Sequence, residues 1–297
     1  MGTMSGAAGA AAAAAPDGAQ APPSDEEMRK LLKPNPTDEE VLAVLSKTYP
    51  TMKLQIVKEL DSYDDKNYLV IDTANDETRY LAKVHNGVES LDYINKHSSS
   101  SSHTSVIDLQ NAIFSHINLV EGVMTSASIP PPPTLAAEDG AVISLHDLPV
   151  MSLDHSPSKL VVRLLTWVPG VPLSSVPSTS LTAESLADAG AYLGKLRRAL
   201  DDLAQTDTDA VQASKRYHVW DGRNTLDLTN FTKYIADEDR RGLVHSVLGA
   251  FRDTFGEDGS KVDFPEGILM GDYNDANILI DGGKVSGVID FGDSVHR

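Results

Sequence analysis

The chain has 297 residues, of which 41% are hydrophobic and 23% charged, as expected of a globular protein long enough to form two lobes. Its formal net charge of −18 argues against a nucleic-acid partner, because phosphate backbones require a basic surface. The charge favours a cationic small substrate through steering, and solubility is an equally good explanation for it. The absence of cysteine excludes disulfide and thiol chemistry, while the lack of a long apolar run or a signal-like start predicts no membrane span and a cytoplasmic location.

Residues 1–36 begin with a stretch rich in Ala, Gly and Pro that cannot offset the entropy of ordering, so we expect a disordered tail. Within it, the segment DEEMRKLL favours a short helix that ends before Pro34. A longer helix should follow, because Thr37 and Glu40 have the spacing of a capping box ahead of an apolar face. The first lobe is therefore expected to begin at Thr37.

From residue 52 the sequence changes to short segments rich in β-forming residues, joined by turn-like stretches. Five segments predict the strands of an antiparallel sheet: KLQIVKEL, NYLVIDTA, RYLAKVH, AVISL and KLVVRLLTWVPG. One helix is predicted over residues 104–120, after a serine-rich loop at 98–102 and before a proline-rich spacer at 129–134. Residues 37–168 are thus expected to form a five-stranded N-lobe.

Beyond Gly170 the pattern becomes mainly helical. Thr182 provides a polar start for one helix, and a second helix is predicted over residues 237–255. The apolar stripe of the first helix is predicted to consist of Leu186, Ala189, Leu193 and Leu196. Short strands return near residue 268, so the fold class is α+β, with residues 169–297 forming a mainly helical C-lobe.

Three oxygen-bearing side chains near the end of the chain have the order that phosphoryl transfer requires. Asp272 can accept the proton of an attacking hydroxyl, while Asn277 and Asp290 can hold Mg²⁺ through oxygen ligands. The turn residues DGGK predict a hairpin that brings Asn277 and Asp290 side by side. Ordinary turns are the alternative, and a calcium loop is a poorer one because Ala276 stands at a ligand position and the closing Glu is missing.

A kinase also needs a cation over the nucleotide phosphates, and Lys83 at the end of the third predicted strand can supply it. The alternative is a solvated strand lysine. Of two candidate helical partners for Lys83, Gln110 lies within the apolar stripe and Asp108 points away from it. We therefore expect Gln110 to face Lys83, and Asp108 to serve as a first-turn acid after Ser105.

The motifs MGDYNDAN and DFGD resemble those of the aminoglycoside phosphotransferase-like kinases, whose signature is H-G-D-x-x-x-x-N followed by D-F-G. Within that family, the segments SYDDKNY, RLLTWVPG and GDYNDANILI are most similar to the hydroxylysine kinases. The resemblance implies a protein-kinase-like two-lobed fold. It also implies transfer of a phosphoryl group from ATP or GTP, with Mg²⁺, to the hydroxyl of a small amine-bearing substrate such as 5-hydroxy-L-lysine.

The resemblance assigns roles to single residues. Asp272 is implied as the catalytic base, Asn277 and Asp290 as magnesium ligands, and Lys83 as the phosphate contact. Residues 62–66 correspond to the loop over the phosphates, although they include two acids and no glycine, so backbone N–H groups would hold the phosphates. The contacts expected from this loop and from the hinge at residues 165–168 are made by Ser62, Tyr63, Leu165 and Trp167.

Two departures from the family pattern stand out. Met270 replaces the histidine before Gly271, which keeps apolar bulk and loses a hydrogen bond, and the chain ends four residues after Asp293, which predicts an incomplete C-lobe. The alternatives are a kinase for another amino alcohol or aminoglycoside, a nucleotide-binding pseudokinase, and an acidic α+β domain that binds a protein. Trp220 is expected to anchor helix packing. The oligomeric state is left open.

Overall fold

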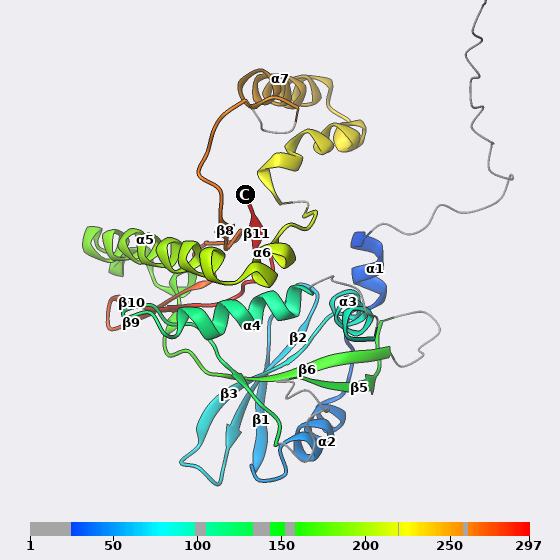
Figure 1. Ribbon diagram of the computed structural model, residues 1–297, viewed down its shortest axis with the longest axis vertical. Helices are drawn as coiled ribbons and strands as arrows, with labels where there is room; N and C mark the ends of the chain where they lie inside the picture. Colours follow the sequence, from blue (N-terminus) through cyan, green and yellow to red (C-terminus); the bar gives the residue numbers. More distant parts are fainter. Residues whose placement is uncertain (1–24, 99–104, 133–142, 152–157, 219, 258–260) are drawn as a thin grey trace, which may run out of the picture.

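The computed structural model describes residues 25–98, 105–132, 143–151, 158–218, 220–257 and 261–297 and has two lobes (Figure 1). The strands are β1 (Leu54–Leu60), β2 (Lys66–Asp72), β3 (Thr78–Val84), β4 (Ser128–Ile129), β5 (Ser144–Leu148), β6 (Ser158–Thr166), β7 (Val171–Pro172), β8 (Ile268–Leu269), β9 (Ile278–Asp281), β10 (Lys284–Val288) and β11 (Val295–His296). The α-helices are α1 (Asp25–Leu31), α2 (Asp38–Thr48), α3 (Gly87–Ser98), α4 (Val106–Ile117), α5 (Ala183–Thr206), α6 (Thr208–Ser214) and α7 (Glu238–Phe255). The 3₁₀ helices are η1 (Leu173–Ser175), η2 (Ser178–Ser180) and η3 (Gly222–Tyr234).

The N-lobe is built on an antiparallel sheet in which the described strands follow the order β1-β2-β3-β6-β4, with β5 also paired to β6. Four of the predicted strands are present at their places, whereas AVISL overlaps β5 only at Ser144 and Leu145, and its first two residues lie outside the described residues. The sixth strand is the two-residue β4, which is too short to show an alternating pattern in the sequence. Helix α2 covers one face and α3 and α4 cover the other (Figure 1). Because side chains alternate along β6, Leu160, Val162 and Leu164 face α2, whereas Arg163 faces α4.

Helix α2 has the predicted capping box. The backbone N–H of Glu40 donates to Oγ1 of Thr37, and the backbone N–H of Thr37 donates to a carboxylate oxygen of Glu40 at 2.8 Å. The expected tail at residues 1–24, most of the serine-rich loop and the end of the proline-rich spacer lie outside the described residues.

Residues 25–36, which we assigned to the tail, belong with the N-lobe. The predicted short helix is present as α1, and its Arg29 lies 2.5 Å from a carboxylate oxygen of Asp64. Two residues beyond α1, Nζ of Lys33 donates to the carbonyl oxygen of Tyr63 at 2.7 Å. The segment is held by these contacts to the loop between β1 and β2, by backbone hydrogen bonds to Pro149 and Gly87, and by Leu32, which packs against the N-lobe core.

Helix α3 was not predicted. Its start is capped by Asn86, whose side-chain oxygen accepts from the backbone N–H of Val88 at 2.9 Å. The helix buries Glu89 and Ser90 along with Tyr93, so the buried face is largely polar and lacks the apolar periodicity that predicts a helix.

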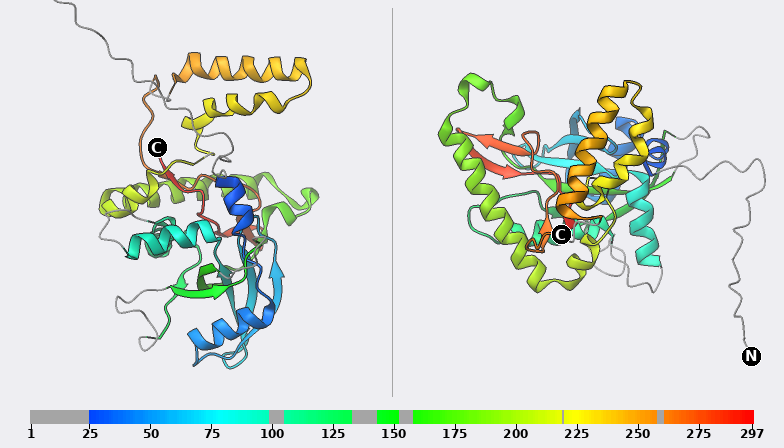
Figure 2. Two further views of the ribbon diagram at one scale, coloured as in Figure 1. Left: turned by 90° about the vertical axis from the view of Figure 1, so that its right-hand side faces the viewer. Right: turned by 90° about the horizontal axis from the view of Figure 1, so that it is seen from above.

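The C-lobe core joins α4 and α5 to the final strands. Helix α5 buries Ala189, Tyr192 and Leu196, whereas Leu186 is 55% exposed and Leu193 43% exposed. The predicted stripe was therefore partly wrong, because Tyr192 takes the inward position and donates its hydroxyl to the carbonyl oxygen of Met124 at 2.9 Å. The predicted helix at 237–255 is present as α7, which packs on η3 at the far end from the N-lobe sheet (Figures 1 and 2). Among the described residues, no helix is long and apolar enough to cross a bilayer.

Phe291 links the last loop to α4. Its side chain is 1% exposed and meets Phe114 edge to face at a centroid distance of 6.0 Å. We expect Phe291→Ala to lower the free energy of unfolding by about 3–5 kcal/mol, because a buried aromatic leaves a cavity. Urea denaturation measures this, with Leu243→Ala on the exposed face of α7 as the control that costs less than about 1 kcal/mol. Equal losses in both variants would contradict the packing described.

Candidate active site

The predicted hairpin brings two of the candidate residues together. Strands β9 and β10 pair with Asp281 opposite Lys284, and both glycines of the turn between them have positive φ, 57° and 82°, as a type I′ turn requires. One step beyond the strand, the backbone N–H of Ile289 donates to the carbonyl oxygen of Asn277 at 3.0 Å. Asn277 therefore lies beside the backbone that leads directly into Asp290.

Asp272 and Asn277 are in direct contact. The side-chain amide of Asn277 donates to Oδ2 of Asp272 at 2.8 Å and to its carbonyl oxygen at 3.0 Å. Because the amide nitrogen is used in this way, Oδ1 of Asn277 is directed elsewhere, and no described residue donates a hydrogen bond to it. A side-chain oxygen in this state can ligate a hard cation.

The loop that holds Asp272 lies against the segment that follows Asp290. Gly271 has a φ of 83°, and a Cβ there would lie 2.2 Å from the carbonyl oxygen of Asp293, so only glycine fits. Met270 is buried in the C-lobe core, which confirms that it keeps the apolar bulk of the residue that it replaces. The catalytic-loop and DFG segments are thus adjacent in space.

Asp290 has an unusual backbone conformation for an aspartate, with a φ of 65°. Its Oδ1 accepts from the backbone N–H of Gly292 at 3.1 Å, and the carboxylate retains solvent-accessible surface. Desolvation by the surrounding protein nevertheless raises the pKa of Asp290, and nearby Lys83 opposes the shift. An exposed aspartate and an amide oxygen that accepts no hydrogen bond from the described residues are oxygen donors of the kind that Mg²⁺ prefers, so Asn277 and Asp290 fit this cation.

Lys83 lies in the N-lobe, opposite Arg163 in the pairing of β3 with β6. It forms a buried ion pair with Asp65. Burial alone would lower the pKa of Lys83, but Asp65, then Asp290 and Glu89, raise it above its usual value, so the ammonium stays charged. The charge of Asp290, from the other lobe, is one of those that favour the ammonium form of Lys83.

Gln110 faces inward as predicted, but its expected pairing with Lys83 is wrong. Its Oε1 accepts from Arg163, whose second terminal nitrogen donates to Oδ1 of Asn111 at 2.8 Å. The guanidinium of Arg163 extends from β6 toward α4 and donates to the side-chain amide oxygens of both residues, so the oxygen of Gln110 is paired with Arg163 and not with Lys83. The acidic residue of a helix near Lys83 is instead Glu89 of α3.

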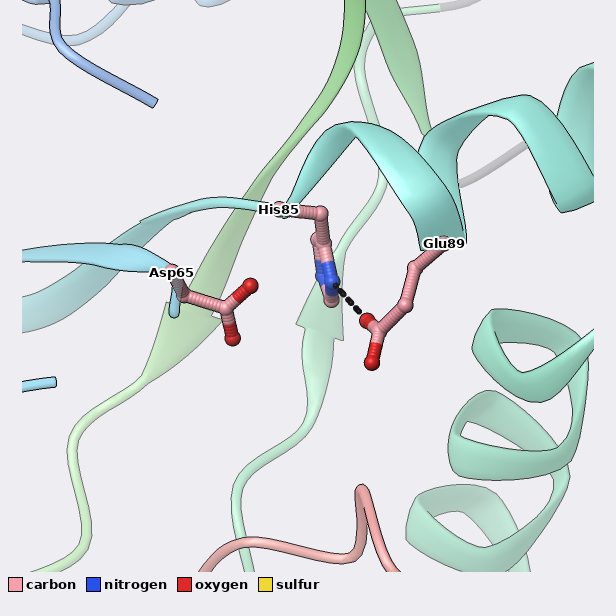
Figure 3. Close-up of side chains that lie close together, drawn as sticks. All are labelled: Asp65, His85 and Glu89. Carbon is pink, nitrogen blue, oxygen red and sulfur yellow. Dashed lines mark hydrogen bonds and ion pairs between the residues drawn. The ribbon is translucent and has the colours of Figure 1, made fainter. Parts of the chain in front are cut away.

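Asp65, His85 and Glu89 form a buried cluster whose ligating atoms lie within 4.8 Å of one another (Figure 3). The cluster does not suit a metal. Nδ1 of His85 is 2.9 Å from Oε2 of Glu89, and Nε2 accepts from Nε of Arg163 at 2.9 Å, so both ring nitrogens are occupied. Arg163 and Lys83 already supply the positive charge, and His85 is a buried polar residue whose hydrogen bonds are satisfied.

The neutral state of His85 predicts a pH dependence of stability. Burial, with Arg163 second, lowers the pKa of His85 from 6.5 to about 4. The unfolded chain therefore gains a proton on this residue at a higher pH than the folded chain, and stability falls as the pH drops from 6.5 to about 4. We expect His85→Gln, which cannot titrate, to lose roughly 3 kcal/mol less than wild type over this range. Urea titrations at several pH values measure the free energy of unfolding of both proteins. An equal fall in the two proteins as the pH drops would contradict the prediction.

The expected nucleotide contacts from the loop and hinge stay predictions. Tyr63 is 76% exposed and its hydroxyl donates to Glu26 at 2.7 Å, while the carbonyl oxygen of Ser62 accepts from Lys33. Leu165 is buried within β6. Trp167 lines a shallow depression together with Thr78, Arg79, Pro169 and Gly170.

Two basic residues missed by the sequence analysis, Arg216 and His218, contact the DFG segment. Arg216 donates to the carbonyl oxygens of Gly292 and Ser294, and Nε2 of His218 lies 3.1 Å from Oδ1 of Asp293. Both belong to the segment KRYHVWDGRN, which carries no local signal for this contact. The predicted packing role of Trp220 is wrong, because its side chain is 77% exposed.

Comparison with known proteins agrees with this arrangement. The chain is 24% identical to hydroxylysine kinase from Xenopus laevis over 275 residues, which cover 88% of this chain and 66% of the relative, so it spans about two thirds of that protein's length. Its fold is similar to that of an aminoglycoside 2′-phosphotransferase-IIIa in its GDP complex (TM-score 0.55, 13% identity, 88% of this chain and 74% of that one). It is also similar to the amicoumacin kinase hAmiN in complex with AMP-PNP, Ca²⁺ and Ami (TM-score 0.53, 15% identity, 87% of this chain and 65% of that one).

These neighbours share the protein-kinase-like fold, which confirms the predicted fold class. The model of the phosphotransferase enzyme family known as APH matches residues 56–296, which include Lys83 and all three of Asp272, Asn277 and Asp290. The chain therefore belongs to the APH phosphotransferase enzyme family.

Proposed function

We propose that the protein is a kinase that transfers the γ-phosphoryl group of ATP or GTP to the hydroxyl of a small amine-bearing substrate. The observation that carries the proposal is the hydrogen bond from the Asn277 amide to Asp272, together with the bond to the Asn277 carbonyl oxygen from the backbone N–H of Ile289, the residue before Asp290. The charge of Asp290 also favours the ammonium form of Lys83. A base, two cation ligands and a phosphate-binding cation are the parts that phosphoryl transfer requires.

In this proposal Asp272 accepts the proton of the attacking hydroxyl, and the Asn277 amide fixes the carboxylate that does so. Oδ1 of Asn277 and the carboxylate of Asp290 hold Mg²⁺, which when bound neutralises charge on the phosphates. Lys83 contributes a second positive charge from the N-lobe side. Phosphoryl transfer of this kind depends on positioning and electrostatic stabilisation more than on covalent chemistry.

The acceptor that we propose is 5-hydroxy-L-lysine. The relative from Xenopus laevis carries the name hydroxylysine kinase, and a net charge of −18 suits an acceptor with ammonium groups through electrostatic steering. Another amino alcohol or an aminoglycoside has the same pairing of amine and hydroxyl, so these compounds belong in the same test.

The test is a substrate panel assayed with Mg·ATP and Mg·GTP, using 5-hydroxy-L-lysine, L-homoserine, choline and an aminoglycoside, and lysine as the acceptor control that lacks the hydroxyl. We expect product with 5-hydroxy-L-lysine, detected by mass spectrometry, and none with lysine. Transfer to a different acceptor alone would reassign the substrate. Nucleotide binding without transfer to any acceptor would favour a pseudokinase, and no thermal shift with either nucleotide would contradict both readings.

A further inference from the structure

The direct partner of Lys83 comes from the loop between β1 and β2, not from a helix. Lys83 forms its ion pair with Asp65, and both side chains are nearly buried, with exposures of 12% and 8%. Asp65 also makes the largest contribution among the charged groups that raise the pKa of Lys83. In protein kinases a glutamate on a helix usually fills this place.

Asp65 is itself held in position. Its Oδ1 accepts from the backbone N–H of Asn86 at 2.7 Å, and its other oxygen meets Lys83. Asn86 in turn donates through its side chain to the carbonyl oxygens of Asp64 and Arg29. The carboxylate is therefore held by the backbone of Asn86 as well as by Lys83, and Asn86 is itself anchored to α1 through the carbonyl oxygen of Arg29.

The helix acid that could serve instead is already engaged. Glu89 of α3 lies 2.9 Å from Nδ1 of His85 and 3.7 Å from Arg29. His85 is fixed on its other side by Arg163, so the Glu89 carboxylate is part of a separate buried network. Glu89 acts on Lys83 through space, and no direct contact joins the two among the described residues.

We propose that Asp65 is the positioning residue for Lys83, replacing the helix glutamate in this role; the inference rests on the proposed kinase function. Because Asp65 belongs to the loop expected to cover the phosphates, its ion pair joins that loop to the phosphate-binding lysine. Without Asp65, the carboxylates that still attract Lys83 are Asp290 and Glu89. The ammonium of Lys83 then shifts toward these carboxylates and into the space where Mg²⁺ would bind beside Asp290, and Mg·nucleotide binds more weakly.

The test measures the affinity of the full chain for Mg·ATP and Mg·GTP by displacement of a fluorescent nucleotide analogue. We expect Asp65→Asn to weaken binding at least about tenfold and to raise KM for nucleotide more than it lowers kcat. Asp65→Glu keeps the charge and should recover most of the loss. The matched control is Glu89→Gln, which also removes a buried carboxylate and should stay within about threefold of wild type.

Unchanged or tighter binding by Asp65→Asn would overturn the inference, as would an equal loss in Glu89→Gln. Wild-type chain that binds neither nucleotide would instead contradict the proposed function. If circular dichroism shows that Asp65→Asn does not fold, the ion pair is tested in the wild-type chain instead. Amine acylation followed by mass spectrometry should modify Lys83 at least about tenfold more slowly than exposed Lys30, and equal rates would overturn the ion pair.

Discussion

Asp272→Asn is expected to lower the rate of phosphoryl transfer by about 10²–10⁴-fold while Mg·nucleotide affinity stays within a few-fold of wild type. The asparagine keeps the shape of the side chain but cannot accept the hydroxyl proton. Its neighbour Asn277, which donates to Oδ2 at 2.8 Å, would face an amide in place of a carboxylate. Steady-state kinetics with the best acceptor of the panel measure the loss, and fluorescent-nucleotide displacement measures the binding.

The matched control is Asp275→Asn, three residues along the same loop, where the exposed carboxylate has no part in the proposed chemistry. This variant should retain activity within about threefold. Asp272→Asn with near-normal turnover would show that another group accepts the proton, and the assignment of the catalytic base would then be wrong.

Asp290→Asn is expected to lower activity by roughly 10²–10³-fold and to shift the Mg²⁺ dependence to higher concentration, because one of two protein ligands loses its charge. Removing a carboxylate whose pKa is raised by desolvation also relieves a cost in the folded chain, so this variant should be at least as stable as wild type. Loss of activity without loss of stability separates a functional ligand from a structural residue.

A Mg²⁺ titration of the rate measures the effect on the cation. The control is Asp281→Asn, at the exposed last residue of β9 beside the hairpin turn, which should leave the Mg²⁺ dependence unchanged. An Asp290→Asn variant that saturates at the wild-type Mg²⁺ concentration would remove this residue from the ligand set.

The features that sequence predicted well are local ones. The glycine pair of DGGK specifies a turn with positive φ, and the alternating segments beside it specify the hairpin that places Asn277 near Asp290. The capping box at Thr37 likewise depends on residues three apart. In each case the interaction partners are neighbours in the chain, so the local sequence pattern is sufficient to predict the interaction.

The partners of Lys83 could not be predicted in the same way. They depend on β3 pairing with β6, which places Arg163 beside Lys83 from 80 positions further along the chain and directs Gln110 to the arginine. Helix α3 was not predicted because it buries polar residues such as Glu89, so its sequence lacks the apolar periodicity of a helix. Asp65 lies in a turn-like stretch, where an acid resembles any solvated loop residue.

The central claim is that Asn277 and Asp290 share one divalent cation beneath a nucleotide whose phosphates Lys83 contacts. The most direct test is a crystal structure of the chain with a non-hydrolysable nucleotide and Mn²⁺, with the cation located by its anomalous scattering. We expect one anomalous peak within ligand distance of both Oδ1 of Asn277 and the carboxylate of Asp290, and Nζ of Lys83 within hydrogen-bond distance of a phosphate oxygen. A peak elsewhere, at Asp65 and Glu89 for instance, would contradict it.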